Sequence, residues 1–189
     1  MGKIFESITT HQRDFILKQK MFFVATAAGE GRVNLSPKGL DAFRLINEHQ
    51  VAWLNLTGSG NETSMHVQQN PRMTMMFCAF EGSPLILRLY GKAKVLHQAD
   101  ENFDTYSKLF PTFTGTRQIF VLDIDKTQSS CGMGVPLYDF VEQRQQLVQS
   151  HDKQGKNGVE AYWKKANQLS FDGDETRVLE LSGIQDESE

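Results

Sequence analysis

The alternation of apolar and polar positions along the chain predicts a β-rich fold. Six segments are rich in β-branched and aromatic residues and end at glycine, proline or other turn residues, which is typical of strands. Gly91 interrupts the longest segment and indicates a bulge or a bend. Pro37 is expected to end the second strand, because proline has no N–H to donate. The predicted strands are residues 21–28, 32–36, 51–56, 73–80, 85–96 and 117–125.

Apolar residues at helical spacing predict short helices between and after these strands. In the first of them, Ile8, Phe15 and Ile16 share one face. The acidic, weakly patterned residues from Asp172 onward predict a mobile tail. The predicted helices are residues 8–20, 64–70, 100–110, 138–152 and 157–168.

The order of these elements favours a mainly β fold with flanking helices. Most strands follow one another through short connections, which indicates antiparallel pairing, and the regular alternation of a doubly wound sheet is missing. We therefore expect a single domain over residues 1–168, built on a six-stranded antiparallel β-barrel, and a mobile acidic tail over residues 169–189.

Composition and charge argue against nucleic-acid, membrane and metal partners. The net charge of -3 and the scattered basic residues do not suggest a nucleic-acid surface. The longest apolar run, residues 22–28, is too short to span a bilayer, and the N-terminus has no apolar signal segment. Cys78 and Cys131 form no CxxC pair, and the histidines have no metal-ligand spacing. We expect a cytoplasmic protein without nucleic-acid, membrane or metal partners.

The glycine-rich turn at residues 57–63, Thr-Gly-Ser-Gly-Asn-Glu-Thr, carries the clearest functional signal. It leaves a predicted strand and opens a predicted helix, where unpaired N–H groups and the helix dipole favour an anion. Glycines let the backbone approach a phosphate closely. The candidate phosphate-binding residues here are Thr57, Gly58, Ser59, Asn61 and Thr63.

Two other interpretations of this turn stay open. Gly, Ser, Asn and Thr also build turns that only cap a helix, and Glu62 fits such a cap while opposing a phosphate. The turn also resembles part of a dinucleotide-binding fingerprint, but Thr63 stands at its third glycine position.

A second cluster lies on the neighbouring predicted strand. Strand alternation places Arg32, Asn34 and Ser36 on one face, and Lys38 follows in the turn. If this strand ends beside the glycine-rich turn, Arg32, Ser36 and Lys38 supply the donors and the positive charge that a phosphate needs. Alternatively, both basic residues are solvated at a sheet edge.

Five runs resemble the pyridoxamine 5′-phosphate oxidase-related family of FMN-binding split β-barrels, over roughly residues 10–136. They are FFVATA, VNLSPKGLD, VAWLNLTGSGNET, HVQQNPRMTMMF and ILRLYGKAKVL. The resemblance implies a homodimer with FMN in clefts between the subunits. It also implies that the phosphate lies against residues 32–38 and 57–63, and that the partner chain covers the flavin ring.

Two departures set the chain apart from the true oxidase. Glu62-Thr63 stands where the oxidase has a basic pair, and a Cys-Gly-Met-Gly-Val-Pro run at residues 131–136 replaces the segment with Trp and Arg that grips pyridoxal phosphate. The resemblance is therefore to an uncharacterised subgroup, without oxidation of pyridoxamine phosphate. Related split barrels bind a deazaflavin or haem, which remain alternative cofactors.

Arg88 and Cys131 complete the candidate cofactor-binding residues. Arg88 stands between two leucines of a predicted strand, so it contacts either a partner group or solvent. Cys131, flanked by Gly132 and Gly134, is a redox thiol, a haem thiolate ligand or a small residue in a tight turn.

The function expected is an FMN-dependent oxidoreductase acting on an unidentified small molecule, with an unknown electron donor. The alternative is a non-catalytic flavin or haem binding protein for storage, sensing or haem utilisation. A third interpretation is a barrel whose cofactor site has decayed, leaving a dimeric interaction module. No catalytic residue is assigned.

Overall fold

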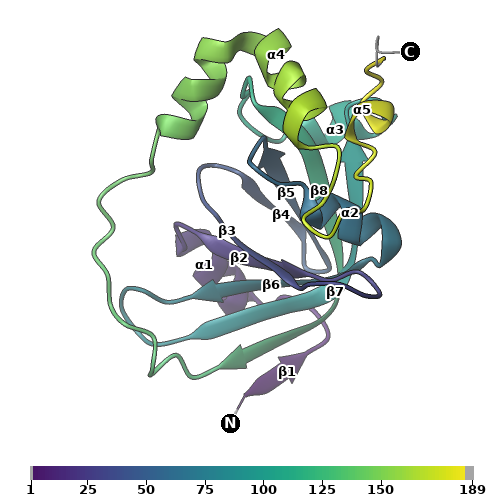
Figure 1. Cartoon of the computed structure of the whole chain (residues 1–189). Coiled ribbons are helices and arrows are strands. Elements are labelled where there is room, and N and C mark those ends of the chain that lie inside the picture. Colours follow the sequence, from purple (N-terminus) through teal and green to yellow (C-terminus); the bar gives the residue numbers. More distant parts are fainter. Residues whose placement is uncertain (1, 186–189) are drawn as a thin grey trace.

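The computed structural model describes residues 2–185, an antiparallel β-sheet with helices on its outside (Figure 1). The strands are β1 (Lys3–Phe5), β2 (Phe22–Thr26), β3 (Asn34–Lys38), β4 (Phe43–Asn47), β5 (Gln50–Leu56), β6 (Arg72–Cys78), β7 (Ile86–His97) and β8 (Thr116–Ser130). The helices are α1 (Thr10–Lys18), α2 (Glu62–Gln69), α3 (Phe103–Ser107), α4 (Gln146–Ala166) and α5 (Val178–Leu181).

The sheet has the order β3-β2-β6-β7-β8-β5-β4, and β1 pairs with the far end of β8. The long strands β7 and β8 pair along their whole length and carry a group of strands on either side. The register shifts between Tyr90 and Gly91, which confirms the predicted bulge. A Cβ at Gly91 would collide with the Asp123 carbonyl oxygen, so only glycine fits this close approach. The expected antiparallel barrel class with flanking helices is thus confirmed.

Strand number and strand ends differ from the prediction. The described residues form eight strands rather than six, because β1 and β4 were missed. Pro37 lies inside β3 instead of ending it, paired with Phe23. β3 is the edge strand and pairs only with β2, so the missing N–H of Pro37 breaks no ladder.

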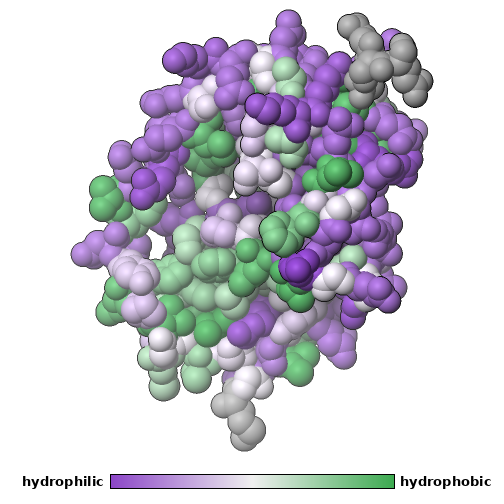
Figure 2. Space-filling view, in the orientation of Figure 1, coloured by the Kyte–Doolittle hydropathy of each residue, from purple (hydrophilic) through white to green (hydrophobic). Residues whose placement is uncertain are grey.

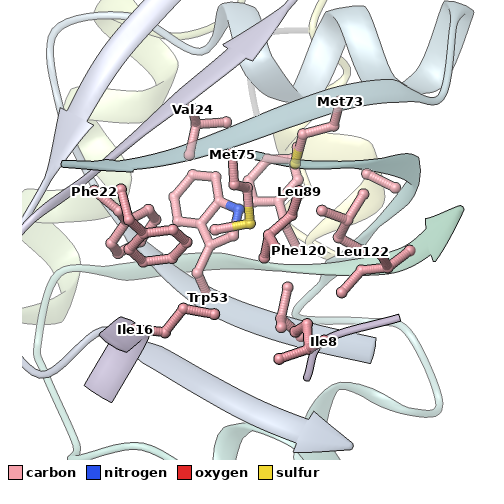
Figure 3. Packing of buried hydrophobic residues seen from close by; sticks show 14 of the residues in the cluster. Ile8, Ile16, Phe22, Val24, Trp53, Met73, Met75, Leu89, Phe120 and Leu122 are labelled. Atoms are coloured by element: carbon pink, nitrogen blue, oxygen red, sulfur yellow. The ribbon is translucent and has the colours of Figure 1, made fainter. Parts of the chain in front are cut away.

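The core lies on both faces of the central strands. In the main cluster, Trp53 of β5 stacks on Phe120 of β8 with ring centroids 4.5 Å apart (Figure 3). The alternate residues Ala52 and Leu54 belong to a second cluster, shared with Phe103 of α3. β5 is therefore buried on both faces, which makes its end a rigid support for the turn that follows.

The C-terminal third departs most from the prediction. Residues 138–145 are not helical, because Tyr138 and Gln143 bond to loop backbone of the barrel. α4 (146–166) consists of two helical stretches that meet at a kink at Gly155, whose φ of 66° is left-handed, so the predicted break between residues 152 and 157 is confirmed. The segment expected to be mobile instead packs on the protein, since Val178 and Leu179 are buried against α4. Residues 186–189 of that expected tail lie outside the described residues.

Among the described residues, no helix has the length and apolar character needed to cross a membrane.

Candidate functional site

The glycine-rich turn and β3 lie next to each other. The turn leaves the buried end of β5 and leads into α2 at Glu62. The Asn34 side chain on β3 donates a hydrogen bond to the Thr63 hydroxyl in the first turn of α2, over 2.9 Å. The two segments singled out in the sequence therefore form one site.

The carbonyl groups of Gly58, Ser59 and Gly60 are bonded on one side of the turn. Asn167, which ends α4, donates from Nδ2 to the carbonyl oxygens of Gly58 (3.1 Å) and Ser59 (3.4 Å). Arg117 of β8 donates to the carbonyl oxygen of Gly60 over 2.9 Å. Arg117 and Asn167 also bond to each other, over 2.6 Å.

This arrangement determines where the N–H groups of the turn point. In a trans peptide, the carbonyl of one residue and the N–H of the next point in opposite directions. The N–H groups of Ser59, Gly60 and Asn61 therefore point away from Asn167 and Arg117. None of the three donates to an acceptor within the described part of the chain. Together with the start of α2, they form a set of donors suited to an anion.

Buried polar side chains around the turn lack partners. Within residues 2–185, the Ser36 hydroxyl, both polar atoms of the Asn61 side chain and Nε of Arg117 are buried without a hydrogen bond. Asn61 and Arg117 are only 3% and 2% exposed. Because buried polar groups are nearly always hydrogen-bonded in native proteins, this concentration indicates a place for a polar ligand.

Two cations share the site: Arg117 is buried and Lys38 is half-buried. Burial and the Arg117 charge together lower the pKa of Lys38 to about 8, against the influence of the Glu62 carboxylate. Burial likewise lowers the pKa of Arg117 to about 10, against the influence of Glu62. Both side chains therefore remain protonated at neutral pH. The Lys38 ammonium also lies 5.0 Å from the Trp53 ring centroid, a cation–π contact that fixes its position.

Glu62 supplies the opposing charge. Its carboxylate folds back over the turn, and Oε1 accepts a hydrogen bond from the Phe171 N–H over 3.1 Å. A Cβ at Gly60 would contact Oε2 of Glu62, so a larger residue at position 60 would displace the Glu62 carboxylate from this position. Glu62 thus balances part of the charge of Lys38 and Arg117 from the start of the helix.

Arg32 has a different setting from the one expected. Its guanidinium pairs with Asp172 and lies 5.1 Å from the Phe171 ring centroid, and its backbone N–H also bonds to Asp172. A cavity of about 480 Å³ separates this pair from the side of α2 and is bordered by His66. In this conformation the Arg32 charge is paired with Asp172, and Arg32 borders the same cavity as Ser59 and Gly60, so its contact with a phosphate stays a prediction.

Thr57 also differs from the expectation. Its hydroxyl donates to the Gly115 carbonyl over 3.0 Å and accepts from the Trp163 indole N–H over 2.8 Å. The one hydroxyl proton of Thr57 is used, so it holds the turn in place and does not face a ligand. Within the turn, Ser59 borders the cavity. The Thr63 hydroxyl accepts a hydrogen bond from the Asn34 side chain.

Arg88 and Cys131 lie elsewhere. Arg88 bonds to the Ser130 hydroxyl at the end of β8, and Cys131 follows there with an exposed thiol. The other end of β7 is next to α2, where His97 contacts Ser64. From Arg88 to His97 the strand advances by about 30 Å, at roughly 3.3 Å per residue. Within one chain, these two residues do not join the turn.

Sequence reasoning missed Arg117, Trp163 and Asn167. A signal existed for Arg117, since Arg117-Gln118 opens an otherwise apolar strand and both side chains are buried. Trp163 and Asn167 gave no such signal, because they occupy ordinary positions at the end of an amphipathic helix.

Comparison with known proteins places this site in a family. The family model described as pyridoxamine 5′-phosphate oxidase matches residues 8–131, more than half of the chain. The chain belongs to the pyridoxamine 5′-phosphate oxidase family. The match contains β3, the glycine-rich turn and Arg117, whereas α4 and α5 lie beyond it.

A curated relative is the pyridoxamine 5′-phosphate oxidase family protein ustO of Aspergillus flavus, 41% identical over 144 residues. The match covers 74% of this chain and 58% of ustO, so the chain spans less than two thirds of that relative.

Solved structures share the fold. HupZ from Group A Streptococcus is 19% identical with a TM-score of 0.52, over 64% of this chain and 91% of that one. A candidate pyridoxamine 5′-phosphate oxidase from Lactobacillus delbrueckii is 15% identical with a TM-score of 0.53, over 65% of this chain and 94% of that one.

Proposed function

We propose that this protein binds FMN through its phosphate and acts as a flavin-dependent oxidoreductase on a small molecule. The observation that carries the proposal is the convergence of unpaired donors at one place. The N–H groups of residues 59–61 and the Asn61 amide belong to the turn that Arg117 bonds, and the Ser36 hydroxyl lies on β3 with Lys38, whose charge interacts with that of Arg117. This donor set fits a phosphate in charge and in hydrogen-bonding type.

Each residue has a defined part in this proposal. Lys38 provides the cation that faces the phosphate, and the turn provides backbone donors. Arg117 adds positive charge while it holds the Gly60 carbonyl. A bound flavin supplies the hydride and electron transfer, while the protein binds and orients it and limits solvent access.

The proposal includes a homodimer. Arg88 and Cys131 lie far from the turn of their own chain, so they reach the same cofactor only from a second copy. Figure 2 shows apolar side chains gathered over the lower part of one face, below α4. Leu35 of β3 and Val33, which directly precedes β3, are 62% and 71% exposed, and Val33 also borders the cavity beside α2. A partner chain on this surface would cover apolar area next to the proposed phosphate site.

The test compares FMN with riboflavin, which lacks the phosphate. We expect the protein to retain flavin absorbance after desalting and to bind FMN at least about 100-fold more tightly than riboflavin. Lys38→Met should reduce that preference at least about tenfold, because it removes one charge-assisted contact. Lys94→Met, at an exposed lysine of β7, is the matched control and should leave the preference unchanged.

Equal affinity of the unaltered protein for FMN and riboflavin would overturn the phosphate site. Retention of a sharp absorbance band near about 400 nm would indicate haem instead of flavin.

A further inference from the structure

The end of α4 touches the glycine-rich turn more closely than any other element beyond the family match. Asn167 is 0% exposed. Its Nδ2 donates to two carbonyls of the turn, and its Oδ1 accepts from Arg117. The NH2 group of the Asn167 amide thus faces acceptors and its oxygen faces a donor. This pattern determines which way the amide is oriented.

Neighbouring contacts fix the rest of the turn. One helical turn before Asn167, the Trp163 indole donates to the Thr57 hydroxyl. The Asn167 carbonyl accepts from the Thr176 hydroxyl, so the segment after α4 secures Asn167 itself. Thr176 is 0% exposed. The turn is therefore held at its start and along its carbonyls by residues from the C-terminal third of the chain.

This support matters because the turn contains two glycines. Gly58 and Gly60 allow the isolated turn many backbone conformations. A ligand that restricts the turn to one of them binds less tightly, because the lost conformational entropy costs free energy. A turn ordered before binding avoids that loss. Glu62-Thr63 also provides no cation at the start of α2. Backbone donors therefore carry a larger share of anion binding here than in a site with a basic pair.

We propose that Asn167 is a positioning residue for phosphate binding, and that the C-terminal segment it belongs to is a working part of the cofactor site. Asn167 acts through the turn: it holds the carbonyls of Gly58 and Ser59 so that the following N–H groups face the phosphate. The inference rests on the proposed FMN function and adds to it a role for the region that follows the family match.

The test is Asn167→Asp, which keeps the side-chain size but replaces the donor with a carboxylate that repels the two carbonyls. Gln168→Glu makes the same chemical change one residue later, at an exposed position, and controls for the added negative charge. Affinities for FMN and riboflavin are measured by fluorescence titration, and folding by thermal melting. We expect N167D to lower the preference for FMN about tenfold or more, with riboflavin binding nearly unchanged, whereas Q168E keeps the preference within about twofold.

The outcomes separate the two proposals. If the unaltered protein prefers FMN and N167D keeps that preference, the positioning role is overturned while the phosphate site stands. A purely structural role would lower the melting temperature and weaken both ligands equally, which also overturns it. If the unaltered protein has no preference, the proposed function fails and the role of Asn167 fails with it. Should N167D not fold, Asn167→Ser removes the two bonds to the turn and the bond from Arg117 without adding charge, and is expected to show the same loss of preference.

Discussion

Glu62 is the residue whose charge works most directly against a phosphate at the turn. The N-terminus of α2 stabilises its carboxylate, and Lys38 and Arg117 lie close enough for Glu62 to raise the pKa of both. Glu62 therefore acts as an internal counter-ion for these two cations. A phosphate that enters the site must compete with this charge.

Glu62→Gln should consequently strengthen FMN binding. Glutamine keeps an oxygen that accepts from the Phe171 N–H, so the fold of the turn is retained while the repulsion is removed. We expect FMN affinity to rise about tenfold, the effect of one nearby charge in a partly buried site, with riboflavin affinity unchanged. The exposed Glu81→Gln is the control. Weaker FMN binding by E62Q would mean that Glu62 supports the site rather than opposing the phosphate.

The residues of the site differ in how readily they can be predicted from the sequence. Lys38, Ser36 and the turn were predictable because each group is continuous and has a recognisable chemistry. Arg117 and Asn167 bond to the turn from 57 and 109 residues away, and no local pattern encodes those contacts. The pairing of Arg32 with Asp172 was hidden for the same reason, over a separation of 140 residues.

At the scale of elements, a buried polar network joins α2 to the sheet. His97 at the end of β7 lies 3.2 Å from the Ser64 hydroxyl and 3.1 Å from Gln118 Nε2 on β8. The Asn55 side chain of β5 donates to the side-chain oxygen Oε1 of Gln118. The side-chain Nε2 of Gln118 therefore faces His97 as a hydrogen-bond donor. Nε2 of His97 must then accept, which requires a neutral ring. Burial and the Arg117 charge lower the pKa of His97 to about 4.

This network makes stability depend on acidity. Between pH 6.5 and about pH 4, the unfolded chain binds a proton at His97 and the folded protein does not, so the free energy of unfolding falls as the pH falls. The loss is at most about 1.4 kcal/mol per pH unit. His97→Gln removes the titrating group and should flatten the curve over this range, measured by urea unfolding at several pH values.

The control for this prediction is the exposed His11→Gln, which should keep the slope of the unaltered protein. Identical slopes for the unaltered protein and H97Q would show that His97 is protonated in the folded state, contrary to the geometry of its Nε2.

The elements that were predicted correctly have strong periodicity and buried faces, as β5 and β7 do. β4 was missed because Phe43–Asn47 is only partly buried and lacks clean alternation. The residues before α4 were wrongly predicted as helix because their apolar positions fit helical spacing. They are instead bonded to loops of the barrel, through the backbone N–H of Tyr138 and the side-chain amide of Gln143. Tertiary contacts overrode local preference in both cases.

At the scale of the whole molecule, the two ends of the barrel carry different candidate residues. The turn and Arg117 lie at the end where α2 begins, and Arg88 with Cys131 lies at the opposite end of β7 and β8. The Lys38 backbone is level with Leu87 in the sheet register, and its ammonium interacts with the charges of Arg117 and Glu62. A two-fold symmetric dimer can bring one end of one chain to the other end of its partner. In that arrangement each cofactor site takes Lys38 from one chain and Arg88 from the other.

Mixed dimers test this sharing directly. Lys38→Met and Arg88→Gln are each expected to abolish tight FMN binding when pure. If the chains are unfolded, mixed in equal amounts and refolded, half of the dimers are hybrids, and one of the two sites in each hybrid contains neither substitution. About a quarter of the normal FMN sites should return, as counted by bound flavin after desalting.

The control mixture uses Arg72→Gln, an exposed arginine at the start of β6, which should bind FMN fully by itself. Mixtures of K38M with R72Q then return FMN sites only in proportion to the R72Q subunits. If dimers form and the K38M and R88Q mixture returns no sites, both residues serve a site within one chain. If pure R88Q binds FMN fully, Arg88 serves no site. A monomer by light scattering at micromolar concentration would exclude a site shared between two chains.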